Sequence, residues 1–196
     1  MHSQEDIKNI YDSEIDYLVD GIKNAKNLYH TFCLSTSNLD FPEARTVVLR
    51  DVKLNPLSIY FNADYRSQKV KEMIENKNCT ALFYDQSRRV QLRLRCEAVV
   101  HYQNNLSRDI WKHTALQSRK CYMGPFPPSD ELKDWHPNIP DEYLKTDPDK
   151  EHSEEGYINF AHIELCIIET DILQLHHNGH IRFKVAKDGS MNFVSP

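Results

Sequence analysis

The segment 64–71 places three cations around the expected start of a helix: Arg66, Lys69 and Lys71. Ser67 is a residue type that caps helix N-termini, and the apolar spacing after it predicts a helix from Ser67 to about Asn76. Helices normally carry acids at this end, because it already bears about half a positive charge. A basic cluster becomes favourable there when an anion such as phosphate lies against the backbone N–H groups. The segment therefore predicts either a phosphate site or a solvated, lysine-rich turn.

A second candidate is the predicted strand Arg45-Thr46-Val47-Val48-Leu49-Arg50, which has a cation at each end. In a regular strand Arg45 and Arg50 point to opposite faces, because the side-chain period is two. Both can serve one ligand only where a bulge or a barrel bend intervenes. The alternative is two edge arginines in separate surface ion pairs, and the sequence leaves this choice open.

A strand is expected over residues 90–102, and within it residues 90–98 alternate strictly between apolar and polar side chains. Its core-facing residues are Val90, Leu92, Leu94, Cys96 and Ala98, and its polar residues are Gln91, Arg93, Arg95 and Glu97. The polar row is either a solvent face with cross-strand pairs or the wall of a cleft. In the second case Gln91 supplies amide hydrogen bonds to a heterocycle.

A mainly β fold with flanking helices is expected to position these segments. Further strands are predicted at 57–61 and 80–84 and in the last forty residues, where Asn178-Gly179 and Asp188-Gly189 are typical hairpin turns. Strand runs interrupted by helices, without a βαβ rhythm, favour an antiparallel barrel with helices packed on it.

The remaining segments complete a single domain over residues 1–196. Residues 5–28 form an amphipathic N-terminal helical region, either one helix or two joined near Asp12-Ser13, and a further helix is expected over 106–118. Residues 124–156 hold six of the nine prolines and many acids, which predicts an irregular, Pro-rich excursion.

Composition excludes several classes of protein. Hydrophobic residues make up 40% and charged residues 27% of the chain, which argues against disorder, and no apolar run approaches the roughly 20 residues that cross a bilayer. The net charge of −5 gives no general reason to bind nucleic acid. Without a signal-peptide pattern at the N-terminus, we expect a cytoplasmic protein with no membrane partner.

No metal site is expected. The five cysteines are scattered and odd in number, which favours reduced thiols over a disulfide framework or a structural zinc site. Three histidines, His176, His177 and His180, flank the Asn178-Gly179 turn, where adjacent strand residues point in opposite directions.

Taken in order, the segments resemble the pyridoxamine 5′-phosphate oxidase-like family of FMN-binding split barrels. That family has an R-x-V-x-L-[RK] strand, F-Y-T-N-like residues, S-R-K opening a helix, an N-P-x-x-x-x-x-F strand and an R-Q-V-R-x-x-G strand. This chain has RTVVLR (45–50), IYFNAD (59–64), SQK (67–69), NKNCTALF (76–83) and VQLRLRCEA (90–98). The resemblance implies an antiparallel split β-barrel, FMN as the cofactor, and a homodimer with the flavin sites at its interface.

The resemblance also implies roles for particular residues. Arg45 and Lys69 match positions that hold the FMN phosphate, and Ser67 and Gln68 complete the matching helix start. Thr46, Val47 and Val48 match a strand whose backbone lies along the flavin ring.

Further matches concern the ring itself. Tyr60 and Phe61 match the pair beside the flavin, and Gln91 matches a glutamine that contacts it. Arg50 matches a basic residue shared by the flavin and substrate sites. A looser match relates Gln117 and Ser118 to a Gln-Ser pair that reaches the flavin from the partner subunit, and Arg182 to a C-terminal arginine near the ring.

Departures from the family pattern predict a divergent member. Gln68 stands where the family has an arginine, which Arg66 could replace from a shifted position, and Phe61 stands where it has a threonine. The family's substrate-phosphate arginine and serine have no clear counterpart around residues 111–115. The leading hypothesis is therefore an FMN-dependent oxidoreductase of unknown small-molecule substrate, with no side chain assigned to catalysis. The alternatives are a non-catalytic split barrel that binds flavin or haem, and a dimeric interaction protein without cofactor.

Overall fold

The structure, a computed structural model, describes residues 3–37 and 41–196 and contains two compact units. The first unit comprises the described residues of Met1–Phe61, Asn76–Val99 and Glu164–Pro196. The second comprises Asn62–Glu75 and Val100–Ile163. Three strands have residues in both units, so the single domain expected from the sequence stays a prediction.

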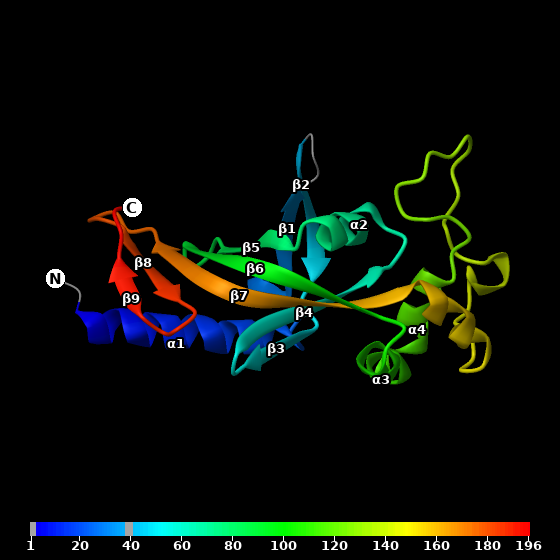
Figure 1. The fold of residues 1–196 in the computed structure, drawn as a ribbon, viewed down its shortest axis with the longest axis horizontal. Helices are drawn as coiled ribbons and strands as arrows, with labels where there is room; N and C mark the ends of the chain where they lie inside the picture. Colours follow the sequence, from blue (N-terminus) through cyan, green and yellow to red (C-terminus); the bar gives the residue numbers. More distant parts are fainter. Residues whose placement is uncertain (1–2, 38–40) are drawn as a thin grey trace. The chain divides into compact units, whose positions relative to one another are not determined.

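An antiparallel sheet dominates the first unit (Figure 1). Its strands are β1 (Thr31–Ser37), β2 (Pro42–Val48), β3 (Asp51–Leu54), β4 (Leu57–Asp64), β5 (Asn78–Asp85), β6 (Val90–Tyr102), β7 (Phe160–Gln174), β8 (Ile181–Ala186) and β9 (Met191–Phe193). They follow the order β2-β1-β5-β6-β7-β4-β3, and β8 pairs with β7 and β9. In the described part of the chain the sheet does not close. The prediction of a mainly β, antiparallel split barrel with flanking helices is confirmed.

The alternation of β6 fixes which of its side chains enter the core. Leu92 and Leu94 are fully buried, whereas Gln91 and Arg93 are half-buried on the other face. β6 pairs antiparallel with β5 from Asn78↔Glu97 to Asp85↔Val90. The predicted strand over 90–102 therefore has the predicted bounds and the predicted facing.

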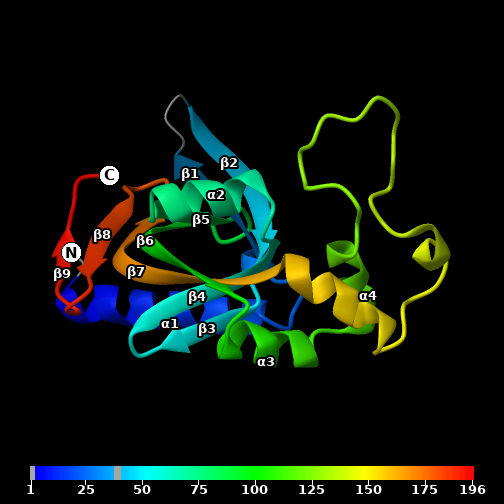
Figure 2. The same cartoon turned by 45° about the vertical axis from the view of Figure 1, so that its right-hand side comes forward.

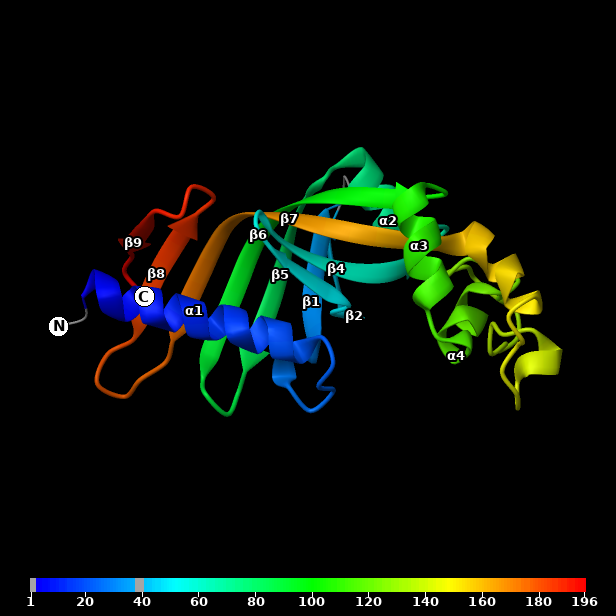
Figure 3. The same cartoon turned by 90° about the horizontal axis from the view of Figure 1, so that it is seen from below.

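Helix α1 (Gln4–Gly21) crosses one face of the sheet of the first unit (Figure 3). It is one helix and not two, since the helix continues without a break through Asp12-Ser13. The buried Glu14 accepts hydrogen bonds from Tyr29 Oη and Arg88 Nη1, both at 2.7 Å. None of the described helices is long and apolar enough to span a membrane.

The second unit contains α2 (Gln68–Glu75), α3 (Asn105–His113), α4 (Leu116–Arg119) and the 3-10 helices η2 (Lys120–Tyr122), η3 (Asp141–Tyr143) and η4 (His152–Asn159). α3, α4 and η4 pack together (Figure 2). The single helix predicted over 106–118 is interrupted, because Thr114 is extended (ψ 131°) and ends α3. The buried Arg119 holds the group together by donating to Trp111 O (2.7 Å), Ser153 Oγ (2.9 Å) and Glu154 Oε1 (2.9 Å).

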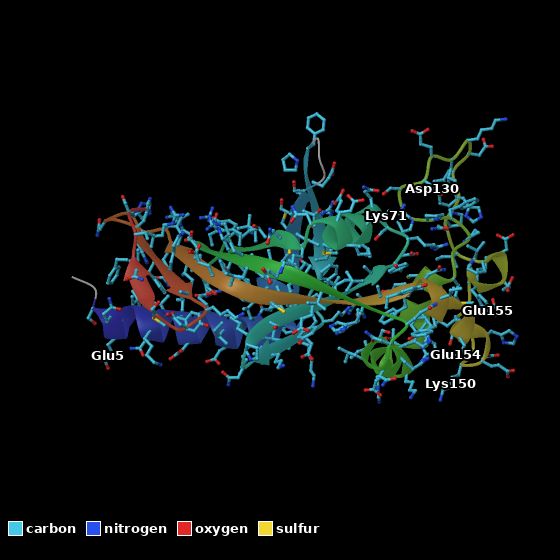
Figure 4. All side chains as sticks on the ribbon, in the orientation of Figure 1. Glu5, Lys71, Asp130, Lys150, Glu154 and Glu155 are labelled. Carbon is cyan, nitrogen blue, oxygen red and sulfur yellow. The ribbon has the colours of Figure 1, made fainter. Side chains whose placement is uncertain are left out.

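A loop over residues 126–138 is closed at its neck by one side chain. The Asn138 amide accepts from Phe126 N (3.0 Å) and donates to Phe126 O (2.9 Å). A Cβ at Gly124 would meet Asn138 O at 2.3 Å, so only glycine fits beside this neck. The loop presents Trp135, which is 88% exposed; Asp130 marks the loop in Figure 4.

Candidate cofactor site

Arg45 and Arg50 lie on either side of a change of strand partner. β2 ends at Val48, two residues earlier than the predicted strand. Leu49 N still donates to His30 O (2.9 Å) next to β1, and Arg50 N already donates to Tyr60 O (2.8 Å) of β4. The chain thus bends between the two arginines, as a shared ligand would require. Arg50 is exposed, and no carboxylate of the described residues pairs with its guanidinium.

The side chains of β2 divide between the two faces of the sheet. Arg45 is opposite Leu34 of β1, and its guanidinium donates to Thr36 Oγ1. Thr46 is exposed, whereas Val47 is buried and Val48 half-buried. The hydroxyl of Thr46 is therefore the accessible polar group of this strand segment.

Tyr60 and Phe61 are both buried in β4. Tyr60 Oη donates to Glu164 Oε1 (2.8 Å), and burial, followed by this hydrogen bond, raises the pKa of the tyrosine. The ring of Phe61 packs edge-on against Phe32, with centroids 6.0 Å apart. Phe61 therefore contributes to the core of the first unit, and its place beside a flavin stays a prediction.

Gln91 differs from the rest of the polar row on β6. Arg93 pairs with Asp171, Arg95 with Glu169 (3.5 Å) and Glu97 with Lys77 (3.1 Å), so these three form the cross-strand pairs of a structural face. The side-chain amide of Gln91 has no hydrogen-bond partner in the part of the chain that the structure describes. It is half-buried, and it remains available to a ligand.

A shallow hollow of about 340 Å³ lies over β1, β2 and β5. Thr31, Thr46, Leu82 and Tyr84 line it, and Tyr84 is the residue opposite Gln91 across the β5–β6 ladder. The hydroxyl-bearing side chains of Thr31, Thr46 and Tyr84 and the apolar side chain of Leu82 are groups that can contact an aromatic heterocycle.

Arg182 forms an ion pair with an acidic residue that the sequence analysis did not identify. It donates two hydrogen bonds to Asp171 (3.0 and 2.9 Å), which Arg93 also contacts. Asp171 is only 2% exposed. Burial raises the pKa of its carboxyl, but the bonds from Arg182 and Arg93 outweigh it and lower the pKa. The sequence signal for this site was weak, because Asp171 is one of three acids in the strand 160–174.

The helix start in the second unit carries cations and no acid. α2 begins at Gln68, which is exposed, and its first turn contains no acidic residue. Ser67 Oγ donates to Asp64 O (2.6 Å) and accepts from Lys69 Nζ (3.2 Å). Arg66 binds Asp64 through two nitrogens (3.0 and 2.7 Å), so its charge is already neutralised and it is a poor substitute for the missing family arginine.

Gln117 and Ser118 lie on the short helix α4, where Gln117 is exposed and Ser118 half-buried. The structure thus brings Ser67 to Lys69 in the second unit, and Arg50 to Tyr60 in the first. The convergence of Arg45 and Lys69 on one phosphate stays a prediction.

Comparison with known proteins supports one family. Residues 13–102 match the model of the pyridoxamine 5′-phosphate oxidase, FMN-binding domain. No curated protein sequence matches the chain.

Solved structures share the fold at low sequence identity. A pyridoxamine 5′-phosphate oxidase-related, FMN-binding protein from Nostoc punctiforme PCC 73102 is 19% identical, with a TM-score of 0.69 over 95% of this chain and 97% of that one. PhzG from Burkholderia lata 383, in complex with tetrahydrophenazine-1-carboxylic acid, is 16% identical, with a TM-score of 0.67 over 97% of this chain and 90% of that one. Residues 13–102 are thus similar to the FMN-binding domain of pyridoxamine 5′-phosphate oxidase, and the chain shares the split-barrel fold of these solved structures.

Proposed function

We propose that the chain binds FMN and acts as an FMN-dependent oxidoreductase on a small molecule of unknown identity. One observation carries the proposal: the segment that matches an FMN-binding domain, residues 13–102, contains Arg45, Lys69 and Gln91. A homodimer with its flavin sites at the interface, and a cytoplasmic location, belong to the same proposal. They follow from the family resemblance and from the cysteine usage.

The residues present fit an anionic flavin. Arg50 offers an exposed guanidinium without a carboxylate partner among the described residues, and the first turn of α2 has no acid to repel a phosphate. The amide of Gln91 can donate and accept hydrogen bonds at a heterocycle. Thr46 lines the hollow over β1, β2 and β5.

In this proposal Arg45 and Lys69 neutralise the phosphate, and Gln91 and the β2 backbone orient the ring. FMN, when bound, supplies the hydride or electron transfer. The role of the protein is to bind the cofactor, to orient it and to shape the pocket, so no side chain is assigned as acid or base.

Absorbance and fluorescence test the binding directly. We expect purified protein to show flavin absorbance, or to quench the fluorescence of added FMN. Arg45→Ala should weaken FMN binding by about 1.5–3 kcal/mol, the range for losing a hydrogen bond to a charged group. Arg108→Ala, which removes a half-exposed arginine of the second unit outside the predicted site, is the matched control. Colourless protein that leaves added FMN unquenched refutes the proposal.

A non-catalytic flavin carrier is the second candidate, and the α3–α4 region favours it. Trp111 is fully buried and Thr114 ends α3, so the region where the family carries its substrate-phosphate residues serves packing here. Anaerobic photoreduction of the FMN complex, followed by reoxidation with candidate acceptors, separates the two functions. An enzyme reoxidises at a rate that depends on the acceptor's structure, and a carrier shows no such selectivity.

A further inference from the structure

Two cysteines of the first unit face each other across neighbouring strands. Cys79 of β5 is the register partner of Cys96 of β6, and both are buried, with exposed fractions of 8% and 2%. Residues directly opposite in an antiparallel pair have Cα atoms about 4.5–5.5 Å apart. A disulfide requires about 4.4–6.8 Å, so the ladder itself supplies the backbone geometry.

Both thiols donate to backbone carbonyls of β6. Cys79 Sγ donates to Cys96 O (3.8 Å), and Cys96 Sγ donates to Leu94 O (3.3 Å). The pKa of Cys96 is raised, first by its hydrogen bond with Cys79 and then by burial. The raised pKa favours the protonated thiol of Cys96.

A hollow of about 370 Å³ gives small molecules access to this pair. Cys79 and Cys96 line it together with Thr36, Thr80, Arg95 and Ile168. Two threonines and an arginine lie among the lining residues, so a small polar molecule can approach the sulfurs. In the β1–β2, β1–β5, β5–β6 and β7–β8 ladders of the described residues, no other cysteine is opposite a second cysteine.

We propose that Cys79 and Cys96 form a thiol–disulfide site whose oxidant is hydrogen peroxide or another small hydroperoxide. The sulfur of Cys79, the more exposed of the two, attacks the terminal peroxide oxygen. An S–O bond forms, the O–O bond breaks, and water or an alcohol leaves with the thiol proton. The sulfur of Cys96 then displaces hydroxide from this sulfenic acid, forming the S–S bond, and its proton leaves in a second water. The two thiols lose two electrons in total, which reduce one peroxide.

Peptide mapping of the native full-length protein tests the site. After treatment with a few equivalents of hydrogen peroxide, free thiols are alkylated and the protein is digested without reductant. We expect one peptide pair that joins Cys79 to Cys96, with a mass lower by two hydrogens, and its loss after treatment with dithiothreitol. Cys33→Ser and Cys121→Ser should keep this pair, whereas Cys79→Ser and Cys96→Ser should lose it.

Three results overturn the proposal. They are full alkylation of both cysteines after peroxide treatment, a bond from either one to Cys166, and further oxidation of Cys79 without a disulfide. Peptide mapping of the peroxide-treated wild-type protein needs no variant, so the test still decides between these outcomes if a serine variant fails to fold. FMN is not required in the assay, so the result is independent of the proposed flavin function.

Discussion

Two sets of arginines in the first unit carry the same charge in different surroundings. Arg88, Arg93 and Arg182 each contact a buried carboxylate, supplied by Glu14, Asp85 or Asp171. Arg50 follows β2 with its guanidinium exposed and without a carboxylate partner in the described chain, and Arg45 donates to the hydroxyl of Thr36. A carboxylate that already neutralises an arginine leaves it little attraction for a phosphate. The first set therefore stabilises the fold, and in the second set we expect Arg50, which has no such carboxylate among the described residues, to bind the anion.

Removing the acid that two arginines of the first set share should have the largest effect on the stability of the fold. Asp171→Ala leaves Arg93 and Arg182 partly buried without their carboxylate, and we expect it to lower the free energy of unfolding by about 3–5 kcal/mol. Urea denaturation at neutral pH measures this change. The control is Asp16→Ala, an exposed acid on α1, which should stay within about 0.5 kcal/mol of the wild type. Equal stability of the two variants would contradict a structural role for the first set.

The affinity for FMN should distinguish the two sets of arginines most directly. We expect Arg50→Ala to weaken FMN binding by about 1.5–3 kcal/mol, the range for losing a hydrogen bond to a charged group. Arg95→Ala, which removes an arginine paired with Glu169, should leave the affinity unchanged. Fluorescence titration of both variants gives the comparison. The distinction between the sets fails if the two variants bind FMN equally.

Acid should weaken the first set by protonating its carboxylates. Burial raises the pKa of Asp85, but hydrogen bonds from Ser87 and Arg88 outweigh it and lower the pKa to about 2. A carboxyl whose pKa is lower in the folded state contributes stability above its unfolded pKa of about 3.9, and that stability is lost as the pH falls towards 2. We expect a loss of at most about 2 kcal/mol between pH 4 and pH 2 from this group.

Urea denaturation of Asp85→Asn across the same pH range isolates this contribution. The variant should be less stable than the wild type at pH 5, and its stability should fall less steeply below pH 4. Parallel curves for the two proteins would show that Asp85 does not carry the predicted acid sensitivity.

The smallest effect is expected at the exposed end of the polar row. Arg95 is 61% exposed and 3.5 Å from Glu169, so Arg95→Gln should cost less than about 1 kcal/mol of unfolding free energy. Added salt should reduce the difference further, because it screens exposed charges. A loss as large as that of Asp171→Ala would mean that exposure does not distinguish these pairs.

Local patterns predicted the elements of the sheet well and the partners of its charged residues poorly. The alternation of 90–98 and the two Asx-Gly turns require only neighbouring residues, so the bounds of β6 and the positive φ of Gly179 and Gly189 could be expected. Arg93 and Asp171 are 78 residues apart, and their contact depends on a strand register that no local signal encodes. The same holds for Tyr60 and Glu164, which are 104 residues apart.

The predicted helix bounds were wrong where the backbone conformation of a single residue ended the helix. The apolar spacing of 106–118 continues through Thr114, and only the extended backbone there separates α3 from α4. For the candidate site, the resemblance supplied Arg45, Lys69 and Gln91 as a set, but it did not show that Arg182 binds Asp171 or that Phe61 packs in the core.

The closed neck at Asn138 indicates where this chain can accept an inserted peptide. One amide satisfies both backbone groups of Phe126, and Gly124 leaves the space that this closure needs. Ser129 and Asp130 lie within the loop and are exposed, so a foreign peptide spliced between them leaves the neck intact. The loop is therefore a suitable insertion site for an epitope or a fluorescent reporter.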